Sequence, residues 1–291
     1  MQQIQVVDVF RPRTYCKARS VAEAAKLLLE HENSVVIAGG TDLLVEKNVS
    51  TSALVDITKL NLDCVKAEEK FVRIGACTTF RHLEQNAILA RQPYSSLVEA
   101  ARTIGSVSIR NEATVGGNVC NAVPSADSPP PLLCLDAKIE IASQSERRIL
   151  DLQDFFVHVR KTALKKGEFV TEFQIPRPPR RTGTSFIKLG RSAHDIAVVN
   201  AATRVTLGED MEIEDVRMVL GAVAPVPLRA RKAEVKLKSG GIDAITEAAS
   251  ISAEETRPIS DVRASAEYRR AMSAVLMKRA LMVAIERSRV M

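Results

Sequence analysis

Two short segments combine adjacent glycines with hydroxyl, amide and carboxylate side chains, a combination suited to binding a ligand rich in oxygen. Residues 38–42 read AGGTD and residues 114–118 read TVGGN. Paired glycines let a backbone approach another group closely, because they carry no side chain. One glycine pair by itself is more typical of an ordinary turn. Two of them, each beside a hydroxyl group, predict loops of one domain that hold a single large ligand carrying phosphate.

No catalytic or metal-binding constellation accompanies these segments. None of the four histidines lies beside a nucleophile in the sequence, which argues against a hydrolase. The nearest cysteine pairs are 13 and 14 residues apart and there is no CxxC, so a local zinc or iron–sulfur site is not indicated. We therefore expect no catalytic residue and no metal site in this chain. The five cysteines fit reduced thiols in a cytoplasmic protein.

Composition narrows the class of protein further. The chain has 291 residues, enough for one large domain or two ordinary ones, and 46% hydrophobic residues, enough for a core. Aromatic residues make up 4% and tryptophan is absent, which argues against a reader of single-stranded nucleic acid. The net charge of +6 is concentrated in residues 177–191 and 257–289, which we interpret as solvated surface or as a face for an acidic partner. We expect no signal peptide and no membrane span.

Periodicity and capping signals predict the helices and strands around the two glycine segments. A capping box, Ser20 with Glu23, predicts a helix from Val21. A short β-branched strand over 35–38 leads directly into the first glycine pair. Further strands are expected over 4–16, 53–57, 64–67, 71–75, 132–143, 148–152 and 168–175, with helices opening at 78 and 95.

A proline-rich segment at 176–183 is the best candidate for a linker, because proline resists both helix and central strand. Beyond it, strands are expected over 184–189, 196–207 and 214–222. Helices follow from residue 228, and the last runs over 265–289. Strands followed by helices predict an α+β domain.

Motifs spread over the whole chain resemble one family. They are IAGGTDLL, RNEATVGGN, PSAD, FVTEFQIP, FIKLGRSAHDIA and YRRAMSAVLMKRAL. In this order and spacing they resemble the FAD-binding, medium subunit of the xanthine dehydrogenase and carbon monoxide dehydrogenase family of molybdenum hydroxylases. The resemblance implies an α+β fold: a two-lobed FAD-binding domain of the vanillyl-alcohol oxidase (PCMH) type over 1–178, then a smaller C-terminal domain over 179–291. That second domain would have a three-stranded antiparallel sheet and a helix bundle.

The resemblance also implies which residues contact FAD. Backbone amides of the first segment would cradle the diphosphate, and the residues implied there are Val36, Ile37, Ala38, Gly39, Gly40, Thr41, Asp42 and Leu43. In the second segment Gly117 would press against the cofactor, and the residues implied are Thr114, Gly116, Gly117 and Asn118.

Four single positions complete the implied set. Ile104 would pack against the adenine, and Asp127 would bind sugar or ribityl hydroxyl groups. The backbone of Val170 would meet the flavin ring. Lys188 would lie near the pyrimidine end of the ring, where a positive charge would tune the reduction potential.

The implied function is electron transfer within a larger complex. A large partner would hold the molybdopterin and oxidise the substrate, a small partner would hold the [2Fe–2S] clusters, and this chain would pass electrons through FAD to an acceptor such as NAD. The cysteine-bearing insertion that binds an extra cluster in some relatives is not expected here. Three alternatives remain open: a self-contained flavin oxidase of the same fold, a nicotinamide-dependent Rossmann enzyme, which lacks its GxGxxG motif, and a basic binding module without catalysis.

Overall fold

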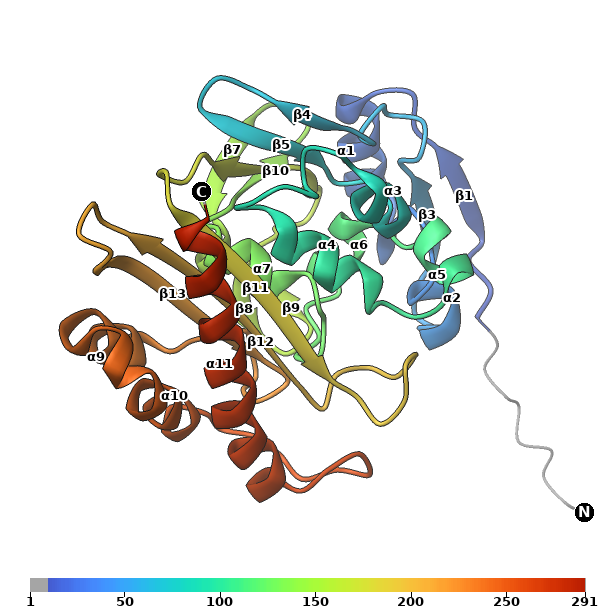
Figure 1. Ribbon diagram of the computed structural model, residues 1–291. Helices are drawn as coiled ribbons and strands as arrows, with labels where there is room; N and C mark the ends of the chain where they lie inside the picture. Colours follow the sequence, from blue (N-terminus) through green and yellow to red (C-terminus); the bar gives the residue numbers. More distant parts are fainter. Residues whose placement is uncertain (1–9, 291) are drawn as a thin grey trace, which may run out of the picture.

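The first lobe of the structure is a small parallel sheet covered by one helix. The structure, a computed structural model, describes residues 10–290, and Figure 1 shows its arrangement. The sheet has the order β1-β3-β2, with β1 (Thr14–Lys17), β2 (Ser34–Ile37) and β3 (Ala53–Asp56) all parallel. Helix α1 (Val21–Glu30) begins as expected: Ser20 Oγ accepts the Glu23 N–H at 3.1 Å. The short helix α2 (Leu43–Glu46) follows the turn at the end of β2.

The second lobe is built on a five-stranded antiparallel sheet. Its order is β4-β5-β10-β6-β7, formed by β4 (Val65–Ala67), β5 (Phe71–Gly75), β10 (Phe169–Pro176), β6 (Lys138–Ala142) and β7 (Arg147–Asp151). Short helices gather beside it: α3 (Phe80–Gln85), α4 (Ser95–Arg102), α5 (Val107–Glu112), α6 (Val115–Cys120), α7 (Pro129–Cys134) and α8 (Leu152–Phe155). A small hairpin, β8 (Phe156–His158) with β9 (Lys161–Thr162), closes this lobe.

Three expectations from the sequence need correction. The run expected as a strand over 132–143 begins instead inside α7, because prolines are tolerated in the first turn of a helix; the strand β6 starts only at Lys138. The segment 114–118 is the N-cap and first turn of α6 rather than a loop. Of the strand expected over 4–16, residues 4–9 lie outside the described residues, and β1 begins after Pro12, at Thr14.

The C-terminal part is a sheet with helices packed against it. Strands β11 (Thr182–Leu189), β12 (Val199–Leu207) and β13 (Ile213–Gly221) are the three expected, and the two-residue β14 (Leu228–Arg229) adds a fourth. The helices are α9 (Arg231–Gly240), α10 (Ile245–Glu254) and α11 (Ala266–Arg289), with a 3₁₀ turn at Ile242–Ala244. Helix α11 packs along β11 and β12, as Figure 1 shows.

The two parts share buried side chains. Phe186, Ala202 and Val219 of the C-terminal sheet belong to the same apolar cluster as Phe80 and Ile139 of the second lobe. The expected division between residues 178 and 179 falls in the segment between β10 and β11 and remains a prediction. Within residues 10–290, no helix is long and apolar enough to cross a membrane.

Candidate functional site

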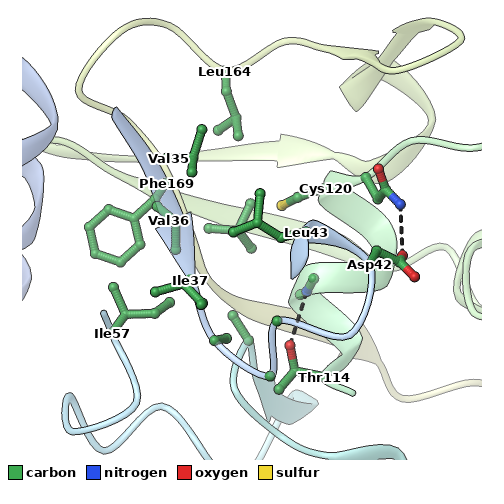
Figure 2. A pocket seen from close by; sticks show the side chains of 18 of the residues that line it. Val35, Val36, Ile37, Asp42, Leu43, Ile57, Thr114, Cys120, Leu164 and Phe169 are labelled. Carbon is green, nitrogen blue, oxygen red and sulfur yellow. Dashed lines mark hydrogen bonds between the residues drawn. The ribbon is translucent and has the colours of Figure 1, made fainter. Parts of the chain in front are cut away.

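A cavity of about 790 Å³ opens between β2 and the second lobe. Most of its wall comes from three stretches of chain within residues 31–43, 113–121 and 164–170. The volume falls in the range of small-molecule and cofactor sites. Figure 2 shows side chains from these three stretches facing one another across the cavity. Both glycine segments therefore reach the same cavity, as the sequence predicted.

The turn after β2 presents a row of unused backbone donors. Residues 38–43 line the cavity, and within the part of the chain that the structure describes the N–H groups of residues 39–43 donate no backbone–backbone hydrogen bond. Gly40 has a φ of +67°, a left-handed conformation that glycine adopts without steric cost. Successive N–H groups in a turn that includes such a residue form a concave site for an anion. This turn suits a phosphate or diphosphate group.

The glycines of the two segments differ in what their missing side chains would touch. A Cβ on Gly39 would lie 1.8 Å from the carbonyl oxygen of Glu112, and one on Gly116 would lie 2.6 Å from that of Ala76. These two glycines allow close packing of backbone on backbone. A Cβ on Gly117 would meet within 4 Å only the hydroxyl oxygen of Thr114, at 3.1 Å, and would otherwise project into open space. Gly117, which lines the cavity, therefore leaves room for a ligand.

The second segment contributes space more than hydrogen-bond donors. The N–H of Gly116 donates to Ala76, that of Gly117 donates to Thr114 Oγ1 at 3.1 Å, and that of Asn118 donates to the Thr114 carbonyl. The side-chain oxygen of Asn118 accepts from Ser128 Oγ at 2.7 Å. Thr114 Oγ1 and Asn118 Oδ1 thus already accept hydrogen bonds within the protein. The groups of these two side chains that can still bind a ligand are the hydroxyl hydrogen of Thr114 and the amide nitrogen of Asn118.

Apolar side chains line the cavity along β2. Every residue of β2 is partly exposed, although three of the four are aliphatic. Such exposure follows from their position on the cavity wall, where Val35, Leu43 and Leu164 surround the same space in Figure 2. Burial raises the pKa of the Cys120 thiol, which lies on this wall, to about 12. The thiol therefore stays protonated at neutral pH and acts as an apolar wall group, not as a nucleophile.

Two arginines fix loops that border the cavity. Arg148 donates two hydrogen bonds to Glu168, at 2.9 and 2.8 Å, and a third to the carbonyl of Ala163. These bonds lower the pKa of the Glu168 carboxyl and hold the loop that carries Leu164 to Gly167. Arg110, buried in α5, pairs with Glu84 and donates to the carbonyl oxygens of Ile104 and Gly105. Ile104 thereby stays on the cavity wall.

Asp127 and Lys188 form a buried ion pair that lies behind the residues lining the cavity and does not itself line it. Lys188 Nζ lies 2.7 Å from Asp127 Oδ2 and also donates to the Thr103 carbonyl, next to Ile104. Asn200 donates to the other carboxylate oxygen at 2.8 Å. Both side chains of the ion pair are at least 90% buried. Burial raises the pKa of Asp127, while Lys188 and Asn200 act in the opposite direction. Neither residue is among those that line the cavity.

The other fourteen residues expected to contact a cofactor all line the cavity. Sequence reasoning missed the far end of the wall, at residues 31–34 and 164–169, and the rim residues Glu46 and Asn121. The turn signal Lys165-Lys166-Gly167 before β10 was available in the sequence, but nothing local says that it faces β2. Among residues 10–290, no group of three or more His, Cys, Asp or Glu side chains is placed to hold a metal ion.

Comparison with known proteins finds two matching families. The sequence model described as FAD binding domain in molybdopterin dehydrogenase matches residues 8–178. The model described as CO dehydrogenase flavoprotein C-terminal domain matches residues 184–284.

Individual proteins match over nearly the full chain. The xanthine dehydrogenase FAD-binding subunit of Escherichia coli O157:H7 is 33% identical over 94% of this chain and 96% of its own length. The glyceraldehyde dehydrogenase medium chain of Sulfolobus acidocaldarius is 34% identical over 92% of this chain and 96% of its own. Among solved structures, a chain of carbon monoxide dehydrogenase from Hydrogenophaga pseudoflava superposes with a TM-score of 0.90, at 30% identity, over 95% of this chain and 98% of the other.

Proposed function

Since the chain belongs to the family of FAD-binding subunits of xanthine and carbon monoxide dehydrogenase-type molybdenum hydroxylases, we propose that it passes electrons from a partner subunit to an acceptor by way of FAD held in the cavity. FAD, when bound, supplies the reversible uptake of electrons. The chain itself then needs no general base or nucleophile. Its own residues bind, orient and shield the cofactor.

The turn at 39–43 carries the proposal. Its five N–H groups lack backbone acceptors and would donate to the diphosphate, while Gly117 leaves the space that a side chain would fill. The aliphatic side chains of β2, with Leu164 opposite, would exclude water from the cofactor. The hydroxyl group of Thr114 would donate one further hydrogen bond.

We assign Asp127 and Lys188 a supporting role in this proposal. Lys188 holds the Thr103 carbonyl beside Ile104, and Ser128, next to Asp127, donates to Asn118. Lys188 thus fixes the backbone beside Ile104, and Ser128, the neighbour of Asp127, fixes the side chain of Asn118.

The partners follow from what the relatives are called. Relatives named medium chain or subunit belong to assemblies of several chains. We propose that this chain likewise joins a large molybdopterin-binding subunit and a small [2Fe–2S] subunit in the cytoplasm. NAD is the proposed acceptor, and we assign no role in binding nucleic acid.

Titration of the purified, cofactor-free chain with FAD tests the proposal. We expect one FAD to bind per chain, followed through visible flavin absorbance, without covalent attachment. Adding candidate organic substrates to the isolated flavoprotein should leave the flavin oxidised, because substrate is oxidised on another subunit. Rapid bleaching by such a substrate alone would instead identify a self-contained oxidase, and a chain that stays colourless would contradict FAD binding itself.

A further inference from the structure

Four polar residues join three separate elements at the rim of the cavity. Asp42 and Glu46 belong to the turn and α2, Asn121 follows α6, and Arg160 sits in the turn between β8 and β9. We call these four residues the rim clasp. Asp42, Glu46 and Asn121 line the cavity.

The bonds of the rim clasp form one connected network. Arg160 grips Glu46 through two nitrogens, with Nη1 2.5 Å from Oε2 and Nη2 2.8 Å from Oε1. Asn121 accepts from Arg160 at 3.1 Å and donates to Asp42 at 2.7 Å, the bond drawn at Asp42 in Figure 2. The guanidinium of Arg160 lowers the pKa of the Glu46 carboxyl, so the pair is charged at neutral pH. A bidentate arginine–carboxylate pair is among the stronger surface contacts.

Helix α2 has little else to hold it. None of its residues is buried, and the side chains of Leu44 and Val45 are 47% and 75% exposed. It continues directly from the turn at 38–43, whose shape depends on where α2 lies. Segments with few buried apolar contacts open locally at low cost in free energy. The clasp therefore ties α2 and the turn before it to the end of α6 and to the β8–β9 turn.

We infer that the rim clasp controls how fast FAD leaves the chain, with Arg160 as a positioning residue that acts through Glu46 on the diphosphate-binding turn. This inference rests on the proposed binding of FAD at that turn. Arg160 is anchored for the role: its own N–H donates to the Ala122 carbonyl at 2.9 Å, which ties the β8–β9 turn to the end of α6. When the clasp opens, the turn loosens and the bound cofactor escapes.

The test compares FAD release from the reconstituted full chain with that of variants. Release is followed by flavin fluorescence after dilution. We expect R160Q and E46Q each to release FAD about fivefold faster, the effect of losing one well-formed surface ion pair. The matched control is K138Q, which removes the Lys138–Asp151 pair, exposed to a similar degree but on β6 and β7. It should release FAD at the wild-type rate.

Two further measurements distinguish a specific effect of the Arg160–Glu46 pair on FAD release from a general loss of stability in the variants. The charge-swapped double variant E46R/R160E should release FAD more slowly than either single change, E46R or R160E. Raising the salt concentration should accelerate release from the wild-type chain more than from R160Q, because screening weakens the pair. Circular dichroism reports whether each variant is folded, and if R160Q is not, E46Q tests the same link from the other side.

The outcomes are distinguishable. A wild-type chain that binds FAD, with folded R160Q and E46Q variants that release it at the wild-type rate, would overturn the clasp alone. A wild-type chain that binds no FAD would overturn the proposed function, and the clasp with it.

Discussion

Gly117 and Gly39 both leave space where another residue would place a side chain. At Gly117 this space is open to a ligand, and at Gly39 it is filled by the protein's own backbone. A valine at Gly117 would project into the cavity, where the only neighbour within 4 Å of the added Cβ is Thr114 Oγ1. A side chain at Gly39 would instead collide with the Glu112 carbonyl at 1.8 Å. The two positions therefore predict two different phenotypes.

We expect Gly117→Val to lose bound FAD while the chain stays folded. Flavin absorbance measures the loss, and circular dichroism measures the fold of the same sample. Gly39→Ala should instead lower the stability of the chain by about 2 kcal/mol, because backbone must move to admit the methyl group. Gly208→Ala, where the added Cβ has its nearest neighbour at 3.9 Å, is the control for both. A full complement of flavin on Gly117→Val would show that the second segment is placed wrongly.

Among the short helices beside the cavity, α5 carries a buried arginine that contacts a neighbouring helix and the loop before α5. Arg110 is 9% exposed and joins α5 to α3 through Glu84 while it holds the carbonyls of residues 104 and 105. Loss of Arg110 leaves the carbonyl oxygens of residues 104 and 105 without this donor and removes the more buried of the two arginines that pair with Glu84.

Replacing Arg110 by Gln should lower the free energy of unfolding by about 3 kcal/mol, measured by urea denaturation. It should also weaken FAD binding, because Ile104 loses its support. Arg81 offers a matched control, since it pairs with the same Glu84 but is 36% exposed. Arg81→Gln should cost less than about 1 kcal/mol. Equal losses in the two variants would mean that the carbonyl contacts of Arg110 contribute nothing.

At the scale of the whole molecule, buried charges join segments far apart in the sequence. Arg269 of α11 is 1% exposed and contacts Asp261 at 2.7 Å and the carbonyls of Val198 and Ala222. Hydrogen bonds from Arg263, together with those from Arg269, hold the pKa of Asp261 well below its usual range. Asp136 of the second lobe likewise pairs with Arg204 and Arg217 of the C-terminal sheet.

The depressed pKa of Asp261 sets the pH at which its contribution to stability disappears. A lowered folded-state pKa means that the contribution is complete above the unfolded value of about 3.9 and is lost as the pH falls through the folded value. We expect Asp261→Asn to lower the free energy of unfolding by about 2 kcal/mol at neutral pH. This is less than for a fully buried pair, because the Asp261 carboxylate is 22% exposed. The difference from wild type should shrink below about pH 4.

Urea unfolding of both proteins across this pH range checks the prediction. Asp243→Asn, at an exposed position of the 3₁₀ turn, is the control and should leave stability unchanged at every pH. A deficit for Asp261→Asn that stays constant down to the lowest pH would rule out the ion pair as its cause.

Near neighbours in the chain specify most of the local elements, and the motifs indicate the kind of ligand. The capping box at Ser20, the hairpin of β4 and β5, the three long strands of the C-terminal sheet and both glycine segments all depend on near neighbours in the chain, so they could be predicted. The resemblance of the motifs to one family then indicated FAD, and the family comparison confirmed it. The strand expected across 132–143 was wrong at its start, because the preference of proline for a first helical turn outweighed the apolar run.

Which of these residues meet depends on how the sheets and helices pack together. The turn at 39–43 has free donors because no strand or helix supplies acceptors there, and the amides of α6 are satisfied because Ala76 and Thr78 approach from β5 and the turn after it. Asp127 and Lys188 are separated by 61 residues, and their pairing behind the wall follows from the packing of β11 on the second lobe. The rim clasp joins Glu46 to a residue 114 positions away. Contacts across such distances are fixed by how the sheets pack together, which no local pattern of residues encodes.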